Sequence, residues 1–145
     1  EEFYKKVNPE SVLDIGCGDG RWYPKFQEWG VKDYYGIDIS SNLIKAAQFR
    51  FPHIADNFSA VKVEDYRRED KVDLVFSYTC TEHIKPEDWD KAVEAIKKMG
   101  KKLLLIEPTN FVGRYYCHDH PYRESFKIIE SKHLGDKTLY LCDLE

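Results

Sequence analysis

The most constraining feature of this sequence is a glycine-rich turn that directly follows a short, mainly apolar run. Ser11–Ile15 suits a strand that is buried on both faces, and Gly16, Gly18 and Gly20 come next at alternate positions. Alternating glycines let a backbone turn tightly and approach a ligand where any Cβ would clash. The pattern therefore predicts a buried strand, a ligand-binding turn and then a helix.

The same alternation of strand and helix continues along the chain. Strands are predicted at Ser11–Ile15, Tyr34–Ile39, Ala60–Glu64, Val72–Ser77, Lys101–Glu107, Phe126–Glu130 and Thr138–Cys142. Helices are predicted at Arg21–Trp29, from an N-cap at Ser40 through Phe49, and at Pro86–Met99.

Repeated strand–helix units favour an α/β fold with a mostly parallel sheet of seven strands and helices on both faces. No helix separates the last two strands, so we expect an antiparallel C-terminal hairpin that turns around Gly135 and Asp136. The chain has 145 residues and no repeat or linker, which predicts a single domain over residues 1–145.

Ligands of such sheets bind beyond the carboxyl ends of the strands. Asp14 stands two residues before the first glycine, where a carboxylate would repel a pyrophosphate and suit an ammonium group. Asp38 ends the second strand, as acids that bind ribose hydroxyls do. The glycine spacing also differs from the dinucleotide fingerprint, which disfavours a nicotinamide oxidoreductase. These features predict a ligand with a ribose, a cationic amino-acid end and no diphosphate. S-adenosylmethionine meets all three conditions.

Four segments of the chain resemble the class I (Rossmann-like) S-adenosylmethionine-dependent methyltransferases. They are VLDIGCGDG at 12–20, YYGIDIS at 34–40, VEDY at 63–66 and VDLVFSYTCTEHI at 72–84. The resemblance covers roughly residues 11–107. It implies a Rossmann-like fold, S-adenosyl-L-methionine as the cofactor and S-adenosyl-L-homocysteine as its product.

The resemblance assigns the methionine end of the cofactor to one side chain and several backbone groups. Asp14 would bind the ammonium group, directly or through water. Backbone groups would come from Gly16, Cys17, Gly18, Ser77 and Tyr78.

The resemblance also assigns the adenosine end. Asp38 would bind the ribose hydroxyls, and Ile39 would pack on the adenine. Asp65, or its neighbour Glu64, would accept a hydrogen bond from the adenine amino group, with Tyr66 covering the ring.

The acceptor side is predicted from position and chemistry. His83 follows the fourth strand and is the candidate general base, since histidine titrates near neutrality; a helix-capping or merely exposed histidine is the alternative. The long segment Pro108–Ser125 follows the fifth strand and is rich in aromatic residues. Its candidate substrate-binding residues are Tyr116, His118, His120 and Arg123, and the alternative is a surface loop packed on the core.

His118 and His120, with Cys117 or Cys80, also invite a metal interpretation. Their spacing matches no familiar zinc pattern, so we predict no metal.

The charge distribution and the cysteines bear on the class of substrate and on the location of the protein. The net charge is -4 with acids and bases mixed along the chain, and a nucleic-acid substrate is disfavoured because no concentrated basic stretch is present. The amino-methylating Asn/Asp-Pro-Pro-Tyr motif is absent, with Ser77–Cys80 in its place. Four well-separated cysteines and no long apolar run predict a cytoplasmic protein outside the membrane.

The sequence thus predicts an enzyme that transfers a methyl group in line from S-adenosylmethionine to a small molecule or a protein side chain. Only ten residues precede the first predicted strand, where the resembling family often has a longer segment over the cofactor. A cofactor-binding, non-catalytic partner subunit therefore stays an alternative, as does a nucleic-acid methyltransferase. The oligomeric state is not predicted.

Overall fold

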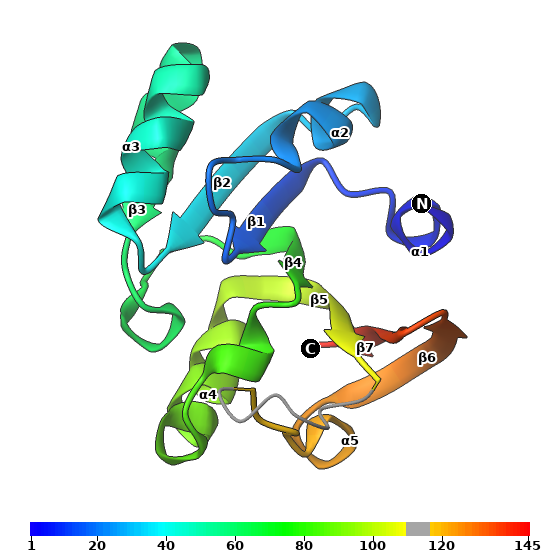
Figure 1. Ribbon diagram of the computed structural model, residues 1–145. Helices are drawn as coiled ribbons and strands as arrows, with labels where there is room; N and C mark the ends of the chain where they lie inside the picture. The colour runs from blue at the N-terminus through cyan, green and yellow to red at the C-terminus, as the bar shows by residue number, and fades with distance from the viewer. Residues whose placement is uncertain (110–116) are drawn as a thin grey trace.

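The computed structural model describes residues 1–109 and 117–145, and its centre is a seven-stranded sheet (Figure 1). The strand order is β3-β2-β1-β4-β5-β7-β6. The first five strands run parallel, and β7 pairs antiparallel with both β5 and β6. The strands are β1 (Ser11–Ile15), β2 (Asp33–Asp38), β3 (Phe58–Ala60), β4 (Val72–Tyr78), β5 (Gly100–Pro108), β6 (Lys127–Leu134) and β7 (Lys137–Asp143). The predicted α/β class and the antiparallel C-terminal hairpin are confirmed.

Helices cover both faces of the sheet, as predicted. The α-helices are α1 (Glu2–Val7), α2 (Tyr23–Glu28), α3 (Ser41–Arg50), α4 (Trp89–Met99) and α5 (Tyr122–Ser125). Short 3-10 turns are η1 (Pro52–Asn57), η2 (Val63–Asp65), η3 (Thr81–His83) and η4 (Pro86–Asp88).

Two hydrophobic clusters, one on each face, form the core. Successive side chains of a strand point to opposite faces, so Val12 packs with α1, α2 and α3, whereas Leu13 packs with α4 and α5. In β5, Leu104 belongs to the same cluster as Val12, and Leu105 belongs to the same cluster as Leu13. Both faces of the central strands are therefore buried, which is why β1 and β5 carry consecutive apolar residues, Val12 and Leu13 in β1 and 103–106 in β5.

The third strand differs from its prediction at Ala60–Glu64. Phe58 is 3% exposed and pairs with Gly36 of β2, so β3 begins earlier. The Val61 N–H then donates to the carbonyl oxygen of Asp38, and the chain leaves the sheet for the 3-10 turn η2. A three-residue strand on the sheet edge carries too short a pattern for sequence periodicity to place it.

Other element boundaries shift by a few residues. Regular helix begins at Tyr23 and Trp89 rather than at Arg21 and Pro86, because 3-10 or turn geometry occupies the first residues. Helix α1 was not predicted. The hairpin turn at Gly135 is confirmed, with a φ of 62° there. No helix in the described part of the chain is long and apolar enough to cross a membrane.

A buried polar contact joins β1 to β2 beneath the glycine-rich turn. Asp14 is 1% exposed, and the Tyr34 hydroxyl donates a hydrogen bond of 2.6 Å to its Oδ2. Burial, reinforced by the nearby Asp38 carboxylate, raises the pKa of Asp14 to about 7, although the Tyr34 hydrogen bond opposes this shift. Folding therefore makes Asp14 a stronger proton binder than it is in the unfolded chain.

We expect Asp14→Asn to change how stability depends on pH. Because the folded-state pKa is raised, the stability associated with Asp14 is present below its unfolded pKa and falls as pH rises from about 4 to about 7. The asparagine cannot ionise, so the variant does not share this pH-dependent loss of stability. The free energy of unfolding of the variant minus that of the parent should therefore be roughly 1–3 kcal/mol larger at about pH 8 than at about pH 5. Urea denaturation at both pH values measures this.

The matched control is Asp33→Asn, at an exposed position of β2. The difference in free energy of unfolding between this variant and the parent should be the same at the two pH values. If Asp14→Asn also kept a constant difference, the buried acid would be ionised throughout and the inferred pKa would be wrong.

Candidate functional site

A cavity of about 580 Å³ opens at the carboxyl ends of β1, β2 and β4. Four segments wall it: the β1–α2 turn, the end of β2 with the start of α3, the segment after β3, and the segment after β4. The lining residues are Ile15, Gly16, Gly18, Arg21, Trp22, Ile37, Asp38, Ile39, Leu43, Val61, Lys62, Val63, Glu64, Tyr78, Thr79, Cys80, His83, Ile84, Lys85 and Asp88. The volume lies within the range of small-molecule and cofactor sites, about 300–1,000 Å³.

The glycine-rich turn forms one wall without side chains. Gly16 and Gly18 have φ values of 72° and 57°, a left-handed conformation that favours glycine. A Cβ on Gly16 would overlap the side chain of Cys80, which packs directly against the turn. A Cβ on Gly18 would meet only Leu43 Cδ1, at 4.0 Å, so the space beside Gly18 is open to a ligand.

The first three backbone N–H groups of the turn already have hydrogen-bond partners within the protein. The N–H groups of Gly16 and Cys17 donate to the carbonyl oxygen of Ile37 at 2.8 and 3.0 Å, and that of Gly18 donates to Asp38 Oδ2 at 3.0 Å. Turns that bind phosphates present such N–H groups to the ligand. This turn therefore suits a ligand that approaches without a diphosphate.

Asp38 is fixed in the cavity wall by both of its carboxylate oxygens. Oδ2 accepts from Gly18 N–H, and Oδ1 accepts from Ser40 N–H at 2.8 Å. Ser40 also caps α3, since its Oγ accepts from Leu43 N–H at 3.3 Å. The carboxylate is thus held in one orientation and retains lone pairs for hydroxyl donors from a ligand.

An exposed apolar rim adjoins Asp38. Ile39 is 76% exposed and Leu43 is 43% exposed, although both are large hydrophobic residues. Val61 and Val63 line the same part of the cavity from the segment after β3. Together they offer an apolar surface for a flat ring.

Three predicted cofactor-binding residues are buried and do not line the cavity. They are Asp14, Cys17 and Ser77, each at most 1% exposed. Burial raises the pKa of the Cys17 thiol, so this cysteine is an inert packing residue. By contrast, Gly16, Gly18, Asp38, Ile39 and Tyr78 line the cavity.

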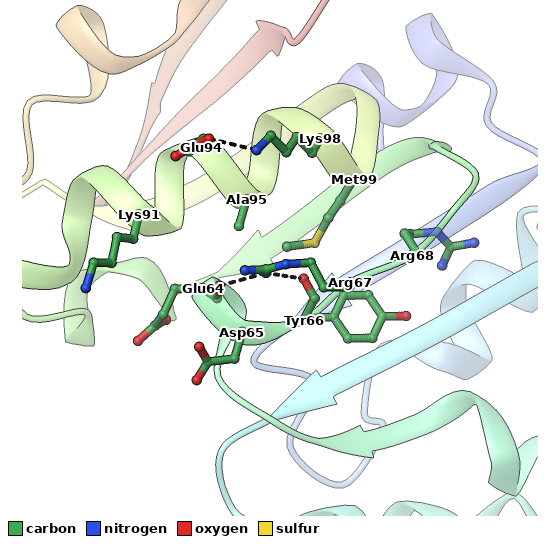
Figure 2. Close-up of a pocket in the computed structure, with 10 residues that line it drawn as sticks. All are labelled: Glu64, Asp65, Tyr66, Arg67, Arg68, Lys91, Glu94, Ala95, Lys98 and Met99. Atoms are coloured by element: carbon green, nitrogen blue, oxygen red, sulfur yellow. Dashed lines mark hydrogen bonds and ion pairs between the residues drawn. The ribbon is translucent and has the colours of Figure 1, made fainter.

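Asp65 and Tyr66 belong to a neighbouring hollow of about 290 Å³ between η2 and α4 (Figure 2). Arg67 closes this hollow by donating from Nη1 to the carbonyl oxygens of Glu64 and Tyr66, each at 2.8 Å. Glu64 lines both the hollow and the larger cavity. Of the two acids considered for the adenine, the structure therefore brings Glu64 to the cavity and turns Asp65 away from it.

The segment after β4 forms the opposite wall. Thr79 has a φ of 49°, unusual for a β-branched residue and common where backbone strain serves a site. His83 lines the cavity with its side chain half exposed, and its Nε2 lies 3.5 Å from Glu82 Oε1. Glu82 is 4% exposed, and its Oε2 has no hydrogen-bond partner among the described residues.

The described candidates for substrate binding in the β5–β6 connection do not line the cavity. Tyr116 lies outside the described residues, and His118, His120 and Arg123 are not among the lining residues. His120 instead stacks on Trp89 with centroids 3.9 Å apart, and its Nε2 donates to the carbonyl oxygen of Ile84 at 2.9 Å. Burial lowers the pKa of His120, consistent with a neutral packing role.

Arg123 points to the C-terminal strands. Its guanidinium lies 5.6 Å from the ring centroid of Tyr140 and donates to Ser131 Oγ at 3.3 Å. Cys80 and Glu82 were not among the residues predicted from the sequence to bind cofactor or substrate. Their position directly after a central strand was the available signal, because the carboxyl ends of parallel strands meet at the ligand site.

Comparison with known proteins places the chain in a family. The sequence of residues 12–102 matches the protein-family model that describes a methyltransferase domain. Phosphoethanolamine N-methyltransferase 2 of Caenorhabditis elegans is 33% identical over 104 residues, which are 67% of this chain and 24% of that protein. Trans-aconitate 2-methyltransferase of Rhizobium rhizogenes is 23% identical over 125 residues, which are 81% of this chain and 48% of that protein. The chain thus spans about a quarter to a half of these relatives.

Solved structures share the fold. An S-adenosylmethionine-dependent methyltransferase from Clostridium acetobutylicum superposes with a TM-score of 0.77 at 12% identity, covering 98% of this chain and 87% of the other. Magnesium protoporphyrin IX methyltransferase from Synechocystis, solved with S-adenosylmethionine bound, superposes with a TM-score of 0.71 at 17% identity, covering 96% and 72%. With the glycine-rich turn, Asp38 and the seven-stranded sheet, these matches show that the chain belongs to the class I S-adenosylmethionine-dependent methyltransferases.

Proposed function

We propose that this chain transfers the methyl group of S-adenosylmethionine to a small molecule. The observation that carries the proposal is the continuity of one cavity. It runs from Gly18 and Asp38, where the cofactor would bind, to the segment Tyr78–Lys85, where an acceptor would enter. A donor and an acceptor held in the same cavity react as if within one molecule.

The described residues fit the cofactor. Asp38 offers a fixed acceptor for ribose hydroxyls, the rim of Ile39 and Val63 offers an apolar surface for adenine, and Glu64 offers an acceptor for its amino group. Next to Gly18 the cavity has room for the methionine moiety. Asp14 would act from beneath the turn, through the field of its carboxylate rather than by direct contact.

When bound, the cofactor supplies a methyl group that its sulfonium already activates, so the protein has mainly to orient the acceptor and exclude water. Tyr78, Thr79 and Cys80 would border the reacting end from the end of β4. His83 lies on the same wall and would contact the acceptor.

A small acceptor is supported by the chemistry of the cavity mouth. Arg21, Lys62, Lys85 and Asp88 give it mixed charge rather than the uniformly basic surface of a nucleic-acid site. The names of the two relatives described above, phosphoethanolamine and trans-aconitate methyltransferases, also specify small acceptors. A protein side chain, a nucleic acid or a non-catalytic role are the alternatives.

A methyl-transfer screen tests the proposal. The protein is incubated with isotope-labelled S-adenosylmethionine in three separate reactions. One contains a pool of small amines and carboxylic acids, one a protein extract and one total RNA. Label should enter the small-molecule pool. Label that enters only protein or RNA, or no fraction at all, would contradict the proposed acceptor class.

We expect Asp38→Ala to weaken binding of S-adenosylhomocysteine by roughly 10- to 100-fold, because the ribose hydroxyls lose a charged acceptor worth about 1.5–3 kcal/mol. Isothermal titration calorimetry measures the change. The control is Asp19→Ala in the same turn, whose carboxylate pairs with Arg50 at 2.8 Å and does not line the cavity. Equal affinities of Asp38→Ala and the parent would refute the ribose assignment.

We expect Gly18→Val to abolish S-adenosylhomocysteine binding while the protein stays folded, because the added side chain would enter the cavity rather than the core. Gly135→Val is a matched control. The two glycines have φ values of 57° and 62°, and neither has a neighbour closer than 4.0 Å to an added Cβ, so both variants carry similar backbone strain.

Thermal denaturation should therefore show similar losses of stability for the two variants, with binding lost in Gly18→Val alone. Retained affinity in a folded Gly18→Val protein would show that the glycine-rich turn does not face the cofactor.

A further inference from the structure

Three potential metal ligands gather beside the cavity, in a set that the sequence did not suggest. Glu82 and His83 belong to η3, directly after β4, and Cys117 comes from the connection between β5 and β6. One ligand atom of each lies within 4.8 Å of the other two. Glu82 and Cys117 are buried, whereas His83 is exposed.

Two hydrogen bonds hold the two segments together. The His118 N–H donates to the carbonyl oxygen of Glu82 at 2.7 Å, and His120 Nε2 donates to the carbonyl oxygen of Ile84 at 2.9 Å. The His120 ring is further fixed by its stacking on Trp89. Cys117 is therefore positioned against η3 by contacts made on its C-terminal side, independently of any ion.

The Glu82 carboxylate gives a second, independent indication of a ligand. It is 4% exposed, its Oε2 has no partner among the described residues, and its Oε1 faces His83 Nε2 at 3.5 Å. A buried carboxylate oxygen without a partner is costly and rare in native structures. A cation between these side chains would satisfy it.

We propose that Glu82, His83 and Cys117 bind a zinc ion. Carboxylate oxygen, imidazole nitrogen and thiolate sulfur are the ligand types of Zn²⁺. Cys117 would release its thiol proton to solvent on binding, and one carboxylate with one thiolate then balances the charge of the ion. Tetrahedral zinc with bonds of about 2.0–2.3 Å needs ligand atoms roughly 3.3–3.8 Å apart, so closure requires side-chain movements of about 1 Å.

Three protein ligands leave a fourth position for water or for an atom of a bound molecule. Because His83 also lines the large cavity, the ion would border the wall opposite the glycine-rich turn. In this arrangement His83 is a metal ligand and not the general base. The inference does not depend on methyl transfer, since metal binding itself is the readout.

The test is titration of the chelator-treated full chain with Zn²⁺ alone, and with Co²⁺ as a spectroscopic probe. We expect saturable binding of one equivalent and a thiolate-to-cobalt charge-transfer band. Glu82→Gln, His83→Ala and Cys117→Ala should each weaken Zn²⁺ binding at least tenfold, and Cys117→Ala should also remove the band. Cys142→Ala is the control, because this buried cysteine of β7 lies outside the cluster.

His83→Ala keeps the test decisive if a buried substitution unfolds the chain, since the His83 side chain is half exposed and circular dichroism can verify its fold. The proposal is overturned if the parent binds no Zn²⁺ saturably. It is equally overturned if folded His83→Ala binds Zn²⁺ as the parent does, or if the cobalt band survives in Cys117→Ala.

Discussion

The carboxylate of Asp38 connects three parts of this domain that no continuous helix or strand joins. It accepts hydrogen bonds from Gly18 in the turn after β1 and from Ser40 at the start of α3, while Asp38 itself ends β2. The turn therefore cannot move independently of β2. The site depends on this tie, because the conformation that leaves space beside Gly18 is the one in which its N–H faces Asp38. A longer or uncharged side chain at position 38 could not satisfy both donors and still face the cavity.

Burial of charge distinguishes the two walls of the cavity. On the β1–β2 side, the buried Asp14 has a hydroxyl partner in Tyr34, and its carboxyl lies out of direct contact with the cavity. On the β4–β5 side, Glu82 and Glu107 are both buried, and each has one oxygen without a partner among the described residues. Burial raises the pKa of Glu107 to about 7, with Glu82 adding to the rise. Unsatisfied acids of this kind concentrate at functional sites, and they lie here on the side where an acceptor would bind.

In the connection between β5 and β6, the same side chains suit two different uses, ligand recognition and packing. His118, His120 and Arg123 were predicted to bind substrate because they follow a strand whose carboxyl end meets the site. His120 fills a gap beside Trp89, and Arg123 lies over Tyr140, so both stabilise the packing of this connection. Aromatic and cationic side chains serve recognition and packing equally well, and only their neighbours distinguish these uses. Cys117, in the same connection, gains its proposed role as a metal ligand from η3, which is distant in sequence.

The sequence by itself determined the local features of this protein. The glycine-rich turn, the acid that ends β2 and the alternation of strands and helices depend on backbone conformation and on periodicity, which neighbouring residues largely fix. From these features the α/β class, the hairpin and the cofactor could be predicted. Six residues singled out in the sequence also line the cavity, namely Gly16, Gly18, Asp38, Ile39, Tyr78 and His83. Tertiary structure decided the rest. Whether Glu64 or Asp65 faces the cavity depends on the 3-10 turn η2, and the meeting of Glu82 with Cys117 depends on how a long connection folds back. Glu82 and Cys117 lie far apart in the chain, so their geometry follows from packing and not from any local pattern.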